Sequence, residues 1–211
     1  MSNILVLGAS GQIAKWVTPA LDQPAIQQTL VVRSPEKLDD PLPGNATVIQ
    51  GNVLDTAVLQ KAMQGQDLVY ANLIGEDLDL QAKAVIEAMT SSGVQRLIFV
   101  LALGIYDEVP GDFGDWNNDI IGEDLKVYRR AADLIEASGL DYTILRPAWL
   151  TDEDEVDYET TARDEPFKGT VVSRKSVADL IIKTIQAPEL HIGENLGVNK
   201  PGTEADKPYF M

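Results

Sequence analysis

The sequence contains no cysteine and only one histidine, His191. Disulfide bridges, thiolate catalysis and metal sites built from several cysteines or histidines are therefore excluded. No apolar run approaches the roughly 18 to 20 residues that cross a bilayer. The first residues also lack the positively charged segment of a signal peptide. We expect a cytoplasmic location, no membrane partner and no bound metal.

Basic residues are also scarce, since 17 Lys and Arg stand against 33 Asp and Glu, for a formal net charge of -16. Such a field repels nucleic-acid phosphate, so we expect no nucleic-acid partner. Hydrophobic residues make up 45% of the 211 positions. This length and composition predict a single domain over residues 1–211 with a core of its own.

Short apolar runs alternate with helix-period segments along the chain, which predicts an α/β fold. We expect three layers: a doubly wound, mostly parallel sheet with helices on both faces. The expected strands are 4–7, 29–32, 46–50, 68–71, 96–102, 142–145, 170–172 and 195–198. The expected helices are 11–21, 55–63, 80–92, 123–138 and 175–186.

Two long loops, 103–118 and 147–168, follow expected strands and are expected to form the substrate side of the domain. We expect no strand in 151–165, because eight of these residues are acidic. Trp116 and Trp149 lie in these loops, where they could wall an aromatic substrate or simply anchor the loops.

The turn after the first strand has the form Gly-x-x-Gly-x-x-Ala, from Gly8 to Ala14. Glycine at both positions allows a tight turn and a close backbone approach to a pyrophosphate, and this placement predicts a Rossmann dinucleotide site. The expected cofactor contacts at this turn are Gly8, Ser10, Gly11, Gln12 and Ile13.

The end of the second strand carries Arg33, where NAD-dependent chains usually have an acid. An arginine there suits the 2′-phosphate of NADP, so NADP(H) is favoured and NAD stays possible. Ser34 and Lys37 could add contacts. Three further cofactor contacts are expected at the next strand ends, namely Asn52, Val53 and Asn72.

These motifs, with a Leu-Arg-Pro-Ala-Trp segment from Leu145 to Trp149, resemble the atypical short-chain dehydrogenases/reductases. The resemblance extends to small epimerase/dehydratase-type, NmrA-like and biliverdin/flavin-reductase-related proteins, and it covers nearly the whole chain. It implies further cofactor contacts at Leu101, Ala102, Pro147, Ala148, Trp149 and Leu150.

The catalytic pair of that superfamily, Tyr-x-x-x-Lys, is incomplete. Tyr128 aligns with the tyrosine, but Ala132 stands where the lysine would lower its pKa. Tyr128 is thus the only catalytic candidate, with packing as the alternative. Asp79 is read as a helix cap, and His191 as a surface or packing residue. A functional role of Asp79, of Tyr106 or of the acidic run 152–159 stays open.

Three functions are compatible with these residues. The leading one is an NADPH-dependent reductase of a conjugated acceptor such as a flavin or quinone, which can take hydride with solvent as proton source. The second is a non-catalytic NADP(H) sensor with a protein partner, like the NmrA-like regulators. The third is a nucleotide-sugar epimerase/dehydratase, which the missing Tyr-Lys pair disfavours.

Overall fold

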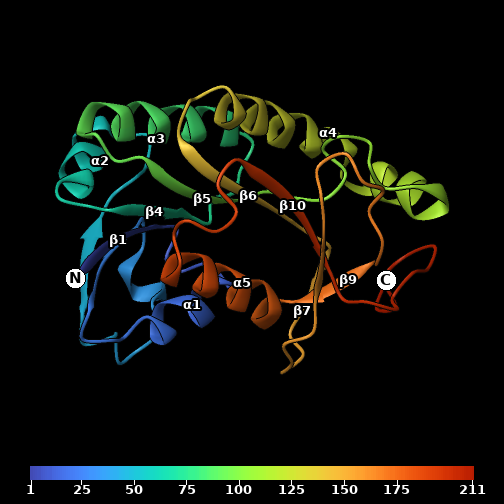
Figure 1. The fold of residues 1–211 in the computed structure, drawn as a ribbon, viewed down its shortest axis with the longest axis horizontal. Helices are drawn as coiled ribbons and strands as arrows, with labels where there is room; N and C mark the ends of the chain where they lie inside the picture. The colour runs from blue at the N-terminus through green and yellow to red at the C-terminus, as the bar shows by residue number, and fades with distance from the viewer.

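An eight-stranded sheet forms the centre of the protein in a computed structural model that describes all residues 1–211 (Figure 1). The strand order is β3-β2-β1-β4-β5-β6-β10-β8. All neighbours pair in parallel except β8 and β10. The strands are β1 (Ser2–Leu7), β2 (Ile26–Val32), β3 (Ala46–Gln50), β4 (Leu68–Ala71), β5 (Arg96–Val100), β6 (Asp141–Pro147), β8 (Glu159–Thr161) and β10 (Glu194–Asn199).

Helices cover both faces of this sheet, as Figure 1 shows. One face carries α1 (Ala14–Ala20) and α5 (Arg174–Gln186). The other carries α2 (Thr56–Met63), α3 (Leu78–Ser92) and α4 (Gly111–Glu136). The side chains of β1 alternate between the two resulting cores, with Ile4 and Val6 in one and Leu5 and Leu7 in the other. The expected three-layer, doubly wound Rossmann fold is thereby confirmed.

Local sequence signals set several helix ends. Asp55 accepts hydrogen bonds from the amides of Ala57 and Val58 and so caps α2. Gly93 ends α3 in the left-handed conformation at φ 74°, which favours glycine. The Ser173 hydroxyl accepts from the Ser176 amide at the start of α5. No helix has both the length and the apolar character that crossing a membrane requires.

The prediction of a loop over 103–118 was wrong for its second half, because α4 begins at Gly111 rather than near residue 123. This first part is rich in glycine, aspartate and asparagine, which have low helix propensity. Burial of Phe113 and Asn117 compensates for that low propensity. Trp116 therefore lies on a helix, not in a loop.

The expected loop 147–168 also contains strands. β7 (Trp149–Thr151) pairs with β9 (Val171–Ser173) in a separate two-stranded sheet. β8 lies inside the acidic segment that was expected to hold no strand, and it pairs with β10 at the sheet edge. The sequence did not predict β8, because this strand is short and surrounded by acids. Its partner strand lies about forty residues further along the chain, so no local pattern indicates the pairing.

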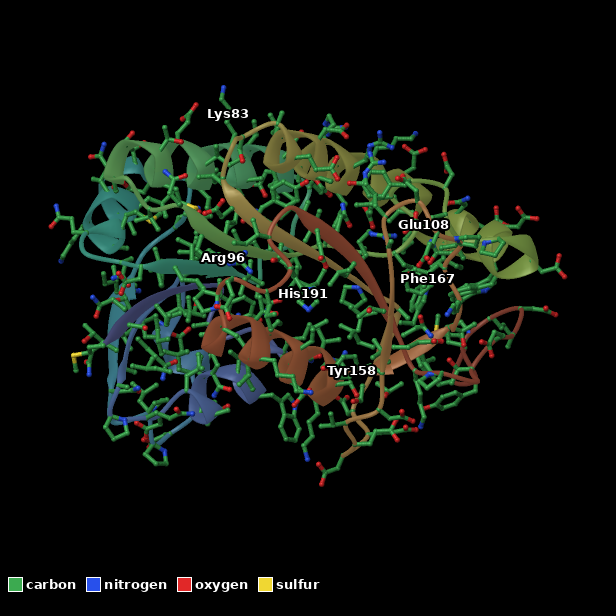
Figure 2. The ribbon with its side chains drawn as sticks, in the orientation of Figure 1. Lys83, Arg96, Glu108, Tyr158, Phe167 and His191 are labelled. Carbon is green, nitrogen blue, oxygen red and sulfur yellow. The ribbon has the colours of Figure 1, made fainter.

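A buried ion pair connects the elements at this end of the sheet. Arg146 at the end of β6 is fully buried and bonds Glu108 of the β5–α4 connection, which is also buried. Arg146 also donates to Asn195 Oδ1 over 2.7 Å. Glu108 accepts from the amides of Gly104 and Tyr106, each over 2.9 Å. Figure 2 shows Glu108 beside Phe167, whose amide donates to the Glu108 carbonyl over 2.8 Å.

We predict that Glu108→Ala lowers the free energy of unfolding by about 3 to 5 kcal/mol, because it leaves the Arg146 guanidinium buried without a counter-charge. Asp133→Ala is the control, since its pair with Arg129 is half exposed and should cost less than about 1 kcal/mol. Urea titration of both variants measures the difference. Equal losses would contradict the assignment.

Candidate cofactor site

A cavity of about 620 Å³ opens where β1, β2, β3 and β4 end. Carboxyl ends of parallel strands are the usual ligand site of this architecture. The lining residues are Gly8, Ser10, Gly11, Gln12, Ile13, Val31, Val32, Arg33, Ser34, Lys37, Gly51, Asn52, Val53, Asn72, Leu73, Ile74, Asp77, Gln81, Leu150 and Arg174.

The two glycines of the turn lie close to Asn72, which follows β4. Gly8 has φ +77°, and a Cβ built there would lie 2.2 Å from the Asn72 carbonyl oxygen. A Cβ on Gly11 would lie 2.2 Å from Asn72 Nδ2. The backbone amide of Asn72 donates to the Leu7 carbonyl over 2.9 Å, which fixes β4 against β1. Gly8 is therefore required by the backbone packing of the segment after β4, whereas at Gly11 the close neighbour is the end of a flexible side chain.

The same turn presents free donors to the cavity. The amides of Ser10, Gln12 and Ile13 form no hydrogen bond within the protein, whereas the Gly11 amide is used by the Gly8 carbonyl. Ser10 is half-buried and Ile13 is buried, and amides without partners in such positions are rare in proteins. Unused amides around a glycine cradle suit the oxygens of a pyrophosphate, so these residues fit the expected dinucleotide.

The cavity reverses the charge balance of the protein. Its lining holds three bases, Arg33, Lys37 and Arg174, and one acid, Asp77. The whole chain has about twice as many acids as bases. Arg33 follows β2, and the short 3₁₀ turn Pro35–Lys37 places Lys37 at the same end. An anionic ligand is favoured here over the rest of the surface.

The structure brings together ten of the residues expected to contact the cofactor: Gly8, Ser10, Gly11, Gln12, Ile13, Arg33, Asn52, Val53, Asn72 and Leu150. The Asn52 side-chain oxygen accepts from the Leu54 amide over 3.0 Å, which leaves the Asn52 Nδ2 group free to donate. The other five expected contacts do not line the cavity and stay predictions: Leu101, Ala102, Pro147, Ala148 and Trp149.

Tyr128 does not line the cavity. Its ring is half buried and packs against the apolar layer between the sheet and helices α2 to α4. Burial raises the pKa of Tyr128, and the nearby Asp124 carboxylate raises it further. A general acid of this superfamily needs the opposite shift. The geometry therefore favours the packing role that the missing lysine suggested.

Among the lining residues that were not expected from the sequence, three are polar or charged: Asp77, Gln81 and Arg174. Gln81 donates to the Ile74 carbonyl over 3.1 Å and to Asp77 over 2.6 Å, which holds the β4–α3 loop against the cavity. Arg174 opens α5, far from the glycine turn in sequence. No local motif marks these residues, because only the packing of α3 and α5 brings them to the strand ends.

Other candidate residues have structural partners. The Tyr106 hydroxyl donates to Glu136 over 2.9 Å, and burial together with this bond raises the Tyr106 pKa. Asp79 was expected to cap α3, but the N-cap position is Asp77. Its carboxylate instead accepts from Arg130 of α4 over 2.6 Å.

Carboxylates of the acidic run 152–159 and the ring of His191 also have side-chain partners. Arg174, Lys175 and Lys200 contact carboxylates between residues 152 and 155. His191 Nδ1 lies 2.7 Å from Glu194. No group of three or more His, Asp or Glu side chains is arranged to hold a metal ion.

The fold and the cradle together define a Rossmann-type NAD(P)-binding protein. The model of the NAD(P)H-binding family matches residues 8–188, so the chain belongs to that family. A Rossmann-fold NAD(P)-binding family protein from Shigella flexneri is 59% identical, with 100% of both chains covered and a TM-score of 0.88. A short-chain dehydrogenase/reductase from Veillonella parvula DSM 2008, solved in complex with NADP, is 29% identical over 99% of both chains, with a TM-score of 0.89.

Two curated relatives carry functional names. Uncharacterized sugar epimerase YhfK of Bacillus subtilis (strain 168) is 30% identical over 87% of this chain and 87% of that protein. Quinone oxidoreductase 2 of Escherichia coli (strain K12) is 29% identical over 71% of this chain and 49% of that protein. These matches confirm the resemblance to the atypical short-chain dehydrogenases/reductases.

We predict that Gly8→Ala destabilises the protein by about 1 to 3 kcal/mol, because it places a side chain at positive φ and against the Asn72 carbonyl. Gly122→Ala, inside α4 with only an ordinary 3.8 Å contact, is the control and should be neutral or stabilising. Thermal unfolding compares them. A Gly8→Ala variant as stable as the parent would refute the cradle geometry.

Proposed function

We propose that this protein is an NADPH-dependent reductase of an uncharged, conjugated acceptor, with a quinone as the best match. The observation that carries the cofactor part is the cavity, in which a glycine cradle with free amides adjoins Arg33 and Lys37. Arg33 and Lys37 suit a 2′-phosphate, which NADPH has and NADH lacks. The NADP complex of the Veillonella parvula protein supports the same choice.

An aromatic cluster supports the acceptor part. Trp149 and Trp116 lie with ring centroids 4.9 Å apart, and Trp116 stacks on Phe113 at 6.1 Å. Trp149 Nε1 donates to Asn117 Oδ1 over 2.9 Å, which fixes the ring. Leu150, the next residue of β7, lines the cofactor cavity. A flat, conjugated molecule placed beyond the cavity would therefore meet aromatic surface.

The absence of a placed acid supports this acceptor class. Bound NADPH supplies a hydride, so NADPH is oxidised to NADP⁺ while a quinone takes the hydride and a solvent proton to become the hydroquinone. Carbonyl reduction to an alcohol needs a positioned proton donor. Ala132 stands where the partner lysine would be, and burial raises the pKa of Tyr128 instead of lowering it.

Charge favours a quinone over a phosphorylated flavin. Phe113 of the aromatic cluster lines a second cavity of about 770 Å³. The charged residues of that cavity are Asp112, Glu165, Glu204, Asp206 and Lys168. Four acids against one base at this end disfavour an anionic acceptor. The relative named quinone oxidoreductase 2 supports the same acceptor.

We predict that Arg33→Asp weakens NADPH binding by about 1.5 to 3 kcal/mol, because a charge-assisted bond to the 2′-phosphate is lost. NADH binding should change little. Lys207→Asp makes the same charge change at an exposed site away from the cavity and serves as the control. Calorimetric titration measures all three proteins. Equal losses for NADPH and NADH would mean that Arg33 supports the fold instead.

We predict NADPH oxidation with menadione that exceeds oxidation with a sulfonated naphthoquinone, and riboflavin reduction that exceeds FMN reduction. Tyr128→Phe should keep activity within about twofold, because its hydroxyl lies outside the cavity. The loss of NADPH absorbance measures the oxidation rates. UDP-sugars are included in the panel and are tested for conversion. Tight NADPH binding without turnover of any acceptor would favour the sensor function, and UDP-sugar conversion would favour the epimerase function.

A further inference from the structure

Arg174 is the one basic residue that faces the cofactor cavity from α5. Its position relative to the glycine turn follows from contacts of α1. Lys15 bonds Asp39 over 3.0 Å, near the Arg33–Lys37 segment. The next residue, Trp16, contacts the start of α5, with Lys175 Nζ 5.4 Å from the ring centroid. Arg174 and Arg33 line the same cavity and come from different elements, Arg174 from the start of α5 and Arg33 from the end of β2.

The guanidinium of Arg174 has unused donor capacity. One terminal nitrogen donates to Asp152 Oδ1 over 2.7 Å. The Nε group is buried and has no hydrogen-bond partner. A buried donor without a partner is unfavourable, so a ligand oxygen that reached and satisfied it would be favoured.

The bond to Asp152 is easily exchanged. The Arg174 side chain is 17% exposed, whereas the Asp152 carboxylate is 84% exposed and returns to water when released. An ion pair whose carboxylate is so exposed contributes little to stability, less than a charge-assisted bond between arginine and phosphate. Lys175 and Lys200 still hold the segment through Asp154 and Glu155.

We propose that Arg174 binds the cofactor pyrophosphate from the α5 side, opposite the free amides of the glycine turn, and exchanges Asp152 for the phosphate oxygens when the nucleotide enters. The 2′-phosphate would stay with Arg33 and Lys37. Arg174 thus contributes to affinity for any pyrophosphate-bearing nucleotide, without discriminating NADPH from NADH. The inference rests on NAD(P) binding and not on the acceptor.

The test is calorimetric titration of Arg174→Ala with ADP-ribose, NADH and NADPH. We expect a similar loss for all three, of about 10-fold to 100-fold, because all three carry the pyrophosphate. Lys175→Ala is the matched control, since the neighbouring lysine does not line the cavity. Its affinities should stay within about twofold of the parent.

Asp152→Asn gives an independent readout, because it frees Arg174 without removing it. It should bind the three nucleotides at least as tightly as the parent, and Arg174→Lys should recover part of the loss. Unchanged affinities in Arg174→Ala, with thermal unfolding showing a folded protein, would overturn the proposal. A loss confined to NADPH would overturn it in favour of 2′-phosphate recognition, and a parent that binds none of the three would overturn it as well. A parent that binds nucleotides but reduces no acceptor would leave this inference standing and refute only the reductase.

Discussion

The buried ion pair of Arg146 with Glu108 joins the parts of the protein that surround the proposed acceptor side. Taking both charges out of water is expensive, and the cost is offset only because Asn195 and the backbone amides near Glu108 satisfy the remaining groups. The pair fixes the end of β6 against the β5–α4 connection. The two segments that it joins lead into α4 and into β7.

The cofactor side depends on a different constraint, which is close backbone approach. Gly8 lies so near the Asn72 carbonyl that β1 and β4 can meet only without a side chain there. This contact leaves neighbouring amides unused and directed at a cavity that concentrates bases in an acidic protein. Acids elsewhere repel anions, so the charge distribution and the cradle together favour an anionic ligand at this cavity.

Sequence reasoning succeeded where the signal is local. The glycine turn, the Asp55 cap and the Gly93 helix end each depend on residues within a few positions of one another. It failed for the first half of α4 and for β8, where burial and strand pairing outweigh local propensity. In the cavity lining, expected residues at the ends of β1 to β4 are present and those at the ends of β5 and β6 are not, whereas Gln81 and Arg174 were not expected because they come from helices elsewhere in the chain.

The sequence by itself determined the layered α/β fold, the cradle between β1 and α1, and the arginine after β2, because hydrophobic period and glycine placement act over short distances. Only the tertiary structure decided that Tyr128 packs on the apolar layer of α2 to α4, that Trp116 meets Trp149, and that Arg174 lines the same cavity as the glycine turn. Those relations depend on how helices pack on the sheet. No spacing along the chain encodes such packing, since it is settled by burial of apolar surface across distant segments.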